Sequence, residues 1–341
     1  MKKTVTALLI FLCFLFLEKS YSKENTEPIK MMFGVHIKKI NLDYKNSTFY
    51  TEFYWWLIFT NDSTKTGISN EDILELEFTN SFDEPVGHFK EGIQESRNLE
   101  NSKYYYSGYH QGNFFFNCNF EDYPFDKQKL KIELENSLLT NDKFLIVPDK
   151  KSYERSQMNK NFRGISKNLL ERKKVNFTIN SCNIFSTDNI YNTDFGDINY
   201  PKNSVFNCLT HEILIERNIV PYITKLFIPL MIILLLVYFV FFIPAEKLDM
   251  AAGLTVTSLL SAIAFQFSIN SDLPEIGYLI YVDKVFYSTY LLIVLAMAES
   301  LWTFYLDLSG DPYKIKLAKT IDVLSRILFP IIFFGLSILF I

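Results

Sequence analysis

The chain has 341 residues, a formal net charge of −4 and four histidines. The near-neutral charge gives no reason to expect a nucleic-acid partner. The sequence contains no glycine-rich phosphate loop, no metal-spaced His/Cys set and no nucleophile elbow, so it predicts neither an enzyme nor a bound cofactor. Charged residues gather in the first two-thirds of the chain, although 49% of all residues are hydrophobic. That asymmetry predicts a polar domain joined to a membrane domain.

The first residues have the pattern of a secretory signal. Lys2 and Lys3 precede an apolar stretch, residues 5–17, that is too short to span a bilayer, and small residues suited to cleavage follow it. We predict a signal peptide over residues 1–22; the alternative is an uncleaved anchor helix. Export would place the next residues on the periplasmic or extracellular side.

Residues 23–217 carry the pattern of an antiparallel β-sandwich of the immunoglobulin-like kind. Short stretches rich in aromatic and β-branched residues alternate with Asn, Asp, Gly and Ser, as in domains made of many short strands. The predicted strands cover residues 35–40, 49–59, 73–78, 104–109, 113–120, 129–134, 174–185 and 206–216.

The cysteines leave one question open. If Cys13 leaves with the signal peptide, three cysteines remain, which allows at most one internal disulfide in an oxidising compartment. Cys182 and Cys208 lie almost symmetrically about a turn signal at residues 194–197, and a hairpin folded there would bring them opposite each other. Two free buried thiols are an equally good interpretation.

Residues 218–341 predict four membrane-spanning helices, at 219–243, 249–269, 278–306 and 321–341. The first and third links carry bases and the second link carries acids, so the positive-inside rule orients the chain. The bases are Lys247, Lys314, Lys316 and Lys319; the acids are Asp272 and Glu275. We therefore predict a multi-pass inner-membrane protein with its N-terminal domain outside the cytoplasm.

The second span has the residues of a pore-lining helix. At 100° per residue, one stripe falls within an arc of roughly 80°. It comprises Asp249, Gly253, Thr257, Leu260, Ala264 and Phe267. Around a symmetry axis, Asp249, with Glu246 just before it, would form carboxylate rings that attract cations, and Leu260 and Phe267 would form apolar constrictions. Because one helix cannot enclose a pore, this interpretation requires a cyclic oligomer. The alternative is that the small and hydroxyl residues serve packing within a four-helix bundle.

The chain resembles the pentameric ligand-gated ion channels, in particular their prokaryotic members. The most specific motif is FEDYPFDKQ at residues 120–128, which is similar to the family's F-x-x-[YF]-P-[FM]-D-x-Q loop. Arg217 before the first span, Pro229 within it, the stripe and Leu273-Pro274 add to the resemblance. The resemblance covers nearly everything after the signal peptide. It implies a homopentamer of extracellular sandwiches above a pore.

The resemblance also assigns roles. In the family's pore register Leu260 is the central leucine ring, Asp249 the cytoplasmic selectivity ring and Thr257 a hydroxyl ring. Two departures from the animal receptors are visible: Phe116 and Leu130 occupy the positions of the Cys-loop cysteines, and the link between the third and fourth spans is short. Ala262 stands where a proton-gated relative has a histidine, which weakens the case for proton gating.

Roles for five residues follow at the contact between the two domains. Asp126 at the base of the sandwich would form a bidentate pair with Arg217, which is a coupling element in the family and also a plain structural salt bridge. Pro124 and Pro274 would lie on the two sides of the contact, and Asp43 would add a second carboxylate.

The agonist site would use aromatic side chains at the subunit interface, where cation–π attraction suits a cationic amine. The candidates are Tyr104, Tyr106, Phe144, Tyr191, Phe195, Tyr200 and Trp55. Protons or hydroxide are the other trigger, and the many acids leave room for modulation by a divalent cation. The expected partners are the lipid bilayer, monovalent cations and a small-molecule agonist. The competing function is a membrane-anchored sensor that signals without conducting ions.

Overall fold

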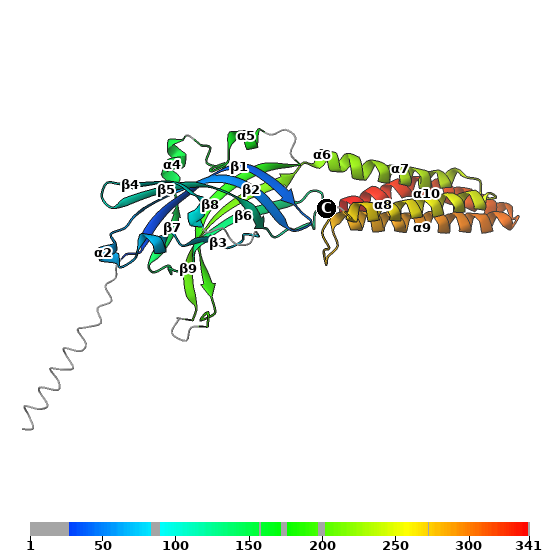
Figure 1. The fold of residues 1–341 in the computed structure, drawn as a ribbon. Coiled ribbons are helices and arrows are strands. Elements are labelled where there is room, and N and C mark those ends of the chain that lie inside the picture. Colours follow the sequence, from blue (N-terminus) through cyan, green and yellow to red (C-terminus); the bar gives the residue numbers. More distant parts are fainter. Residues whose placement is uncertain are drawn as a thin grey trace, which may run out of the picture.

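The computed structural model describes residues 27–82, 89–156, 158–171, 176–196, 202–271 and 273–339. The predicted signal peptide and Tyr200 lie outside these residues. The molecule is elongated, with a β-domain at one end and a bundle of long helices at the other (Figure 1). The last helix ends beside the junction of the two parts.

The β-domain is a sandwich of two sheets. One sheet has the order β4 (Ile93–Leu99), β5 (Lys103–Phe115), β2 (Thr48–Thr60), β1 (Ile29–Asp43) and β7 (Phe144–Pro148); the other has the order β3 (Leu76–Phe78), β6 (Lys127–Asn136), β9 (Ser204–Arg217) and β8 (Phe177–Tyr191). Short helical segments occupy the connections: α2 (Ser63–Thr66), α3 (Asn70–Ile73), η2 (Phe89–Gly92), α4 (Lys150–Arg155) and α5 (Lys167–Leu170).

Alternating apolar residues form the core between the sheets. Along β2 the side chains of Phe53, Trp55 and Leu57 are buried and interleave with more exposed neighbours, as expected for strands with one face in a core. Phe53 packs edge to face on Phe78 of the facing sheet, with 5.7 Å between the ring centroids. The predicted sandwich is therefore confirmed.

Three details differ from the prediction. Residues 104–109 and 113–120 are not two strands, because β5 runs unbroken over Lys103–Phe115. The sequence did not predict β4, whose polar residues lie exposed at a sheet edge, or the five-residue β7. The sandwich is also not wholly antiparallel, since β7 runs parallel to β1.

The membrane part contains four long helical segments. The first, Ile219–Phe242, is composed of α6 (Ile219–Tyr222), the π-helix η3 (Ile223–Phe227), α7 (Ile228–Phe239) and η4 (Val240–Phe242). The others are α8 (Leu248–Asn270), α9 (Tyr281–Leu308) and α10 (Pro312–Leu339). Among the described residues, the first segment, α8 and α9 are long and apolar enough to cross a membrane. The fourth predicted span falls within α10, which packs along α9, and its last two residues are not described.

Candidate pore face and domain interface

The predicted stripe lies on one exposed face of α8. All six of its residues are exposed in the single chain. The largest apolar members, Leu260 and Phe267, are 63% and 72% exposed. Asp249 lies in the first turn of α8, and Glu246 is exposed in the link before it. The chain thus presents an acid and two large apolar side chains along a face that its own helices do not cover.

The opposite face of α8 packs into the helix bundle. Ala251, Thr255, Ser258 and Ala262 are buried there. The Thr255 hydroxyl is 3.0 Å from the carbonyl of Ala251 and 3.3 Å from Met297 Sδ on α9. The hydroxyl residues of α8 therefore divide into two groups, one within the bundle and one, including Thr257, on the exposed face.

At the base of the sandwich, Arg217 and Asp126 form a buried bidentate ion pair. Arg217 Nε donates to Asp126 Oδ1 at 2.7 Å and Nη2 donates to Oδ2 at 3.0 Å. Gln128 Nε2 donates to the same Oδ2 at 2.7 Å. The side chains of Arg217 and Asp126 are only 3% and 2% exposed. The predicted partners thus meet in the predicted geometry, with both carboxylate oxygens engaged.

Three tyrosine rings surround the Arg217 guanidinium. Its carbon lies 4.3 Å from the ring centre of Tyr44, 4.9 Å from Tyr123 and 5.0 Å from Tyr222. The Tyr222 hydroxyl also accepts a hydrogen bond from Nη1 at 3.0 Å. Burial has the largest single effect on the pKa of Arg217 and lowers it, but hydrogen bonding to Asp126 and charge interactions with Asp126, Tyr44 and Tyr222 together raise the pKa overall, so the cation is held charged. Burial raises the pKa of Tyr44.

The predicted role of Asp43 is not met. Its carboxylate accepts hydrogen bonds from Lys45 N at 3.1 Å and from Asn46 N at 3.2 Å, so it stabilises its own turn. The residue of this hairpin that reaches Arg217 is the next one, Tyr44. Sequence reasoning sought a second carboxylate where the structure supplies an aromatic face. Only the position beside Asp43 could have pointed to it.

The loop after β5 is the main contact between the sandwich and the helices. Phe120 N donates to the Tyr278 hydroxyl at 2.9 Å, and Tyr281 N donates to the Glu121 carbonyl at 2.8 Å. Pro124, in the same loop, is buried. Pro274, in the link between α8 and α9, is half-buried. The direct hydrogen bonds from that link thus come from Tyr278 and the start of α9.

A partly buried polar connection joins α8 to α9. Gln266 Nε2 donates to Asp283 Oδ1 at 2.9 Å, and the Tyr290 hydroxyl donates to Gln266 Oε1 at 2.6 Å. Gln266 therefore ties the C-terminal half of α8 to the helix that contacts the sandwich. Sequence reasoning did not identify Gln266 as a partner of Asp283.

The aromatic candidates for an agonist site do not gather within one subunit. Phe144 and Trp55 are each 1% exposed and belong to the sandwich core, so these two predictions are wrong. Tyr104 and Tyr106 stack on Phe59 in the first sheet.

The other described candidates lie at the opposite edge of the sandwich. Tyr191, at the end of β8, packs against Phe206 and against the exposed Phe195, with ring centroids 5.6 Å and 5.9 Å away. Since β5 and β8 lie toward opposite edges of the two sheets, the tyrosine groups on them could share a ligand only across a contact between two subunits.

The disulfide interpretation is wrong in this structure. Cys182 and Cys208 are both free thiols. The hairpin register pairs Cys182 with Ile213 and Cys208 with Thr187, so the two cysteines lie at different heights along it. Cys182 Sγ lies instead 3.1 Å from His211 Nε2. Burial raises the pKa of Cys208 to about 11. The hairpin was predicted correctly, but its turn is not centred between the cysteines.

Comparison with known proteins adds one relative. No family model matches the chain. A curated protein, the proton-gated ion channel of Gloeobacter violaceus, is 27% identical over 125 residues, which are 37% of this chain and 33% of that protein. The matched part therefore spans about a third of the relative's length, and the relative is an ion channel rather than an enzyme. The sandwich, the long apolar helices and this partial similarity to an ion channel agree with the resemblance noted from the sequence.

Proposed function

We propose that the chain is one subunit of a homopentameric ligand-gated channel that conducts monovalent cations through a pore lined by α8. The observation that carries the proposal is the contrast between the two faces of α8. The six residues of the stripe are exposed on one face, and the residues buried in the bundle on the other face are Ala251, Thr255, Ser258 and Ala262.

The chemistry of the exposed face favours a pore over contact with lipid. Asp249 is expensive in hydrocarbon, whereas a carboxylate ring at a pore mouth attracts cations. Leu260 and Phe267 would be apolar constrictions above it. Since α8 of one subunit cannot surround a channel, several copies must supply the ring. The resemblance to the family makes that number five.

The membrane arrangement we propose has four crossings, with α10 as the fourth. The sandwich then lies outside the cytoplasm, in keeping with the bases of the first and third links. In this orientation Asp249 is at the cytoplasmic end of the pore, and Tyr278 and Tyr281 are at its outer end, below the sandwich.

The trigger is proposed to be a proton or a small agonist. The matched relative is named a proton-gated ion channel, so a pH step is the first stimulus to apply. A cationic amine held between the aromatic groups of neighbouring subunits is the other candidate, because the half-buried Tyr191 and the exposed Phe195 form a ring pair on one edge of the sandwich.

The proposed coupling path uses the contacts at the domain interface. A shift of β9 moves Arg217 and, through Asp126, the loop of residues 120–126. The loop acts on Tyr278 and on the start of α9. Asp283 and Gln266 then pass the movement to α8, whose tilt opens or closes the ring of Leu260.

The test is macroscopic current from the protein in oocytes or planar bilayers. We would step pH from 4 to 10, then apply small amines, with sodium on one side and a large impermeant cation on the other. Stimulus-dependent current that reverses near the sodium potential is the expected result. A pentamer shown to be in the membrane but silent under all these conditions would favour the non-conducting sensor.

A further inference from the structure

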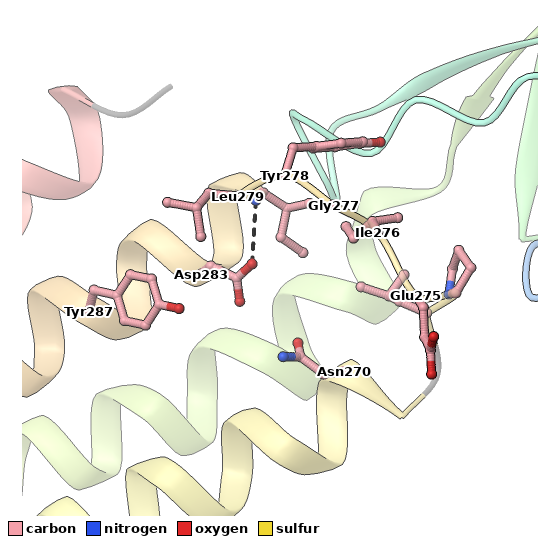
Figure 2. Close-up of a pocket in the computed structure, with 11 residues that line it drawn as sticks. Asn270, Glu275, Ile276, Gly277, Tyr278, Leu279, Asp283 and Tyr287 are labelled. Carbon is pink, nitrogen blue, oxygen red and sulfur yellow. Dashed lines mark hydrogen bonds between the residues drawn. The ribbon is translucent and has the colours of Figure 1, made fainter.

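A cavity of about 510 Å³ opens beside the link between α8 and α9 (Figure 2). Asn270 at the end of α8, Glu275 in the link, and Asp283 and Tyr287 on α9 surround it. Its volume lies within the range of sites that hold small organic molecules. The cavity lies next to Tyr278, which contacts the sandwich, but it does not include the pore stripe.

The charged part of the lining is acidic. The Asp283 carboxylate is buried and fixed in place, since Gln266 Nε2 donates to Oδ1 at 2.9 Å and Ile280 N approaches Oδ2 at 3.4 Å. Glu275 is exposed at the edge of the cavity. None of the described lining residues is Lys or Arg; Lys284, next to Asp283, is half-buried on α9 and is not among them. The lining therefore suits a cation.

The rest of the lining is apolar and aromatic. Leu279 is 55% exposed, and Tyr278 and Tyr287, which also line the cavity, are exposed. An ammonium group is attracted to tyrosine faces as well as to carboxylates. A ligand that satisfies the whole lining needs a positive head and an apolar body.

We infer that this cavity binds an amphiphilic amine, with its ammonium between Glu275 and Asp283 and its chain against Leu279 and Tyr287. In the proposed orientation the cavity lies at the outer surface of the bilayer, where such molecules concentrate. The inference goes beyond conduction, and it can be tested by binding alone. Failure to bind would leave the channel proposal standing, and absence of current would leave the site standing.

The experiment is contact quenching of a reporter tryptophan in the full chain, reconstituted in vesicles of zwitterionic lipid. The reporter is Tyr287→Trp on a Trp302→Phe background; Trp55 and Trp56 in the sandwich serve as internal references. The probe is dodecyltrimethylammonium with a brominated chain, compared with the brominated neutral alcohol. A Leu279→Trp reporter replaces the first if that variant does not fold.

The expected result is saturable quenching by the ammonium probe at a concentration about fivefold or more below that of the alcohol. Glu275→Gln should lower this preference by up to about fivefold, which is the most that an exposed carboxylate contributes. The matched control, Asp307→Asn at the other end of α9, should leave it unchanged. Quenching that rises linearly and equally for both probes, or a preference that Glu275→Gln does not alter, would overturn the inference.

Discussion

Arg217 and Asp126 are 91 residues apart in the chain, yet they form a two-point ion pair within a ring of tyrosines where β9 meets the first membrane helix. The pair is shielded from solvent and joins the end of a strand to the loop that contacts α9. Its removal should therefore affect both stability and gating.

We expect Asp126→Asn to destabilise the protein by about 3–5 kcal/mol, because the guanidinium would stay buried without its counter-charge. The stimulus-evoked current of this variant should also fall. Thermal unfolding followed by near-UV circular dichroism measures the first effect. Glu171→Gln, which breaks the exposed pair with Lys167, is the matched control and should cost about 0.5 kcal/mol or less. Equal losses in the two variants would contradict the role of burial.

Asp249→Asn should weaken the preference for cations without stopping conduction, because it removes the carboxylate ring but keeps the shape of the side chain. The measurement is the reversal potential in asymmetric sodium chloride, which should move toward zero. Asp311→Asn, in the link between α9 and α10, removes a charge from the same side of the membrane outside the stripe. A reversal potential unchanged by Asp249→Asn would remove the selectivity assignment.

Leu260→Ala should make opening easier. Truncation removes apolar contact worth about 2 kcal/mol per subunit from the closed ring, so the stimulus needed for half-maximal current should fall by about tenfold or more. Leu259→Ala is the matched control, since Leu259 packs toward the helix bundle. It should reduce stability with little change in the stimulus. The same shift in both variants would argue against a ring at Leu260.

Tyr278→Phe tests the contact between the domains. It removes the hydroxyl that accepts the Phe120 N–H, a hydrogen bond worth about 1 kcal/mol. We expect the stimulus for half-maximal current to rise about fivefold while the fold persists. Tyr305→Phe, exposed near the far end of α9, should have no effect. If Tyr278→Phe also gates normally, the loop of residues 120–126 does not act through this hydroxyl.

His211 predicts a pH dependence of stability. Burial lowers its pKa to about 4, against about 6.5 in an unfolded chain. Between these values the unfolded state binds the extra proton, so the contribution is fully present above pH 6.5 and is lost as pH falls toward 4. The stability difference between pH 7 and pH 4.5 should be about 2–3 kcal/mol smaller in His211→Gln than in the native chain.

Denaturant unfolding followed by tryptophan fluorescence at both pH values would measure that difference. His36→Gln is the control. His36 is only half-buried, and burial and Lys38 lower its pKa as well, so this variant should change the stability difference between the two pH values less. If His211→Gln loses as much stability between pH 7 and pH 4.5 as the native chain does, other groups cause the loss of stability in acid.

The sequence predicted the sandwich and the long helices because each rests on a local pattern. Alternation along β2 and the unbroken apolar run of α7 are readable without knowing any neighbour. The stripe on α8 was also predictable, because helical geometry fixes which side chains share a face. The pairing of Asp126 with Arg217 came from a resemblance rather than from a pattern.

The contacts between elements were less predictable. Tyr44 and Tyr222 could not be singled out as the rings around Arg217 in a chain with 20 tyrosines and 33 phenylalanines. Phe144 and Trp55 were chosen as ligand residues for the same reason, although a large aromatic residue in a strand more often fills a core. The link from Gln266 to Asp283 depends on how two helices pack, which neither helix reveals alone.

Strand β9 runs without a break from Ser204 to Arg217. At roughly 3.3 Å per residue it is about 45 Å long, and it is paired on both sides, by β6 and by β8. One end supports the ring cluster of Tyr191 and Phe206, and the other ends in the guanidinium above the membrane helices. A strand paired on both sides is stiff along its length. A small tilt imposed at the hairpin therefore displaces the other end of the strand at the membrane, because no flexible segment lies between the two ends.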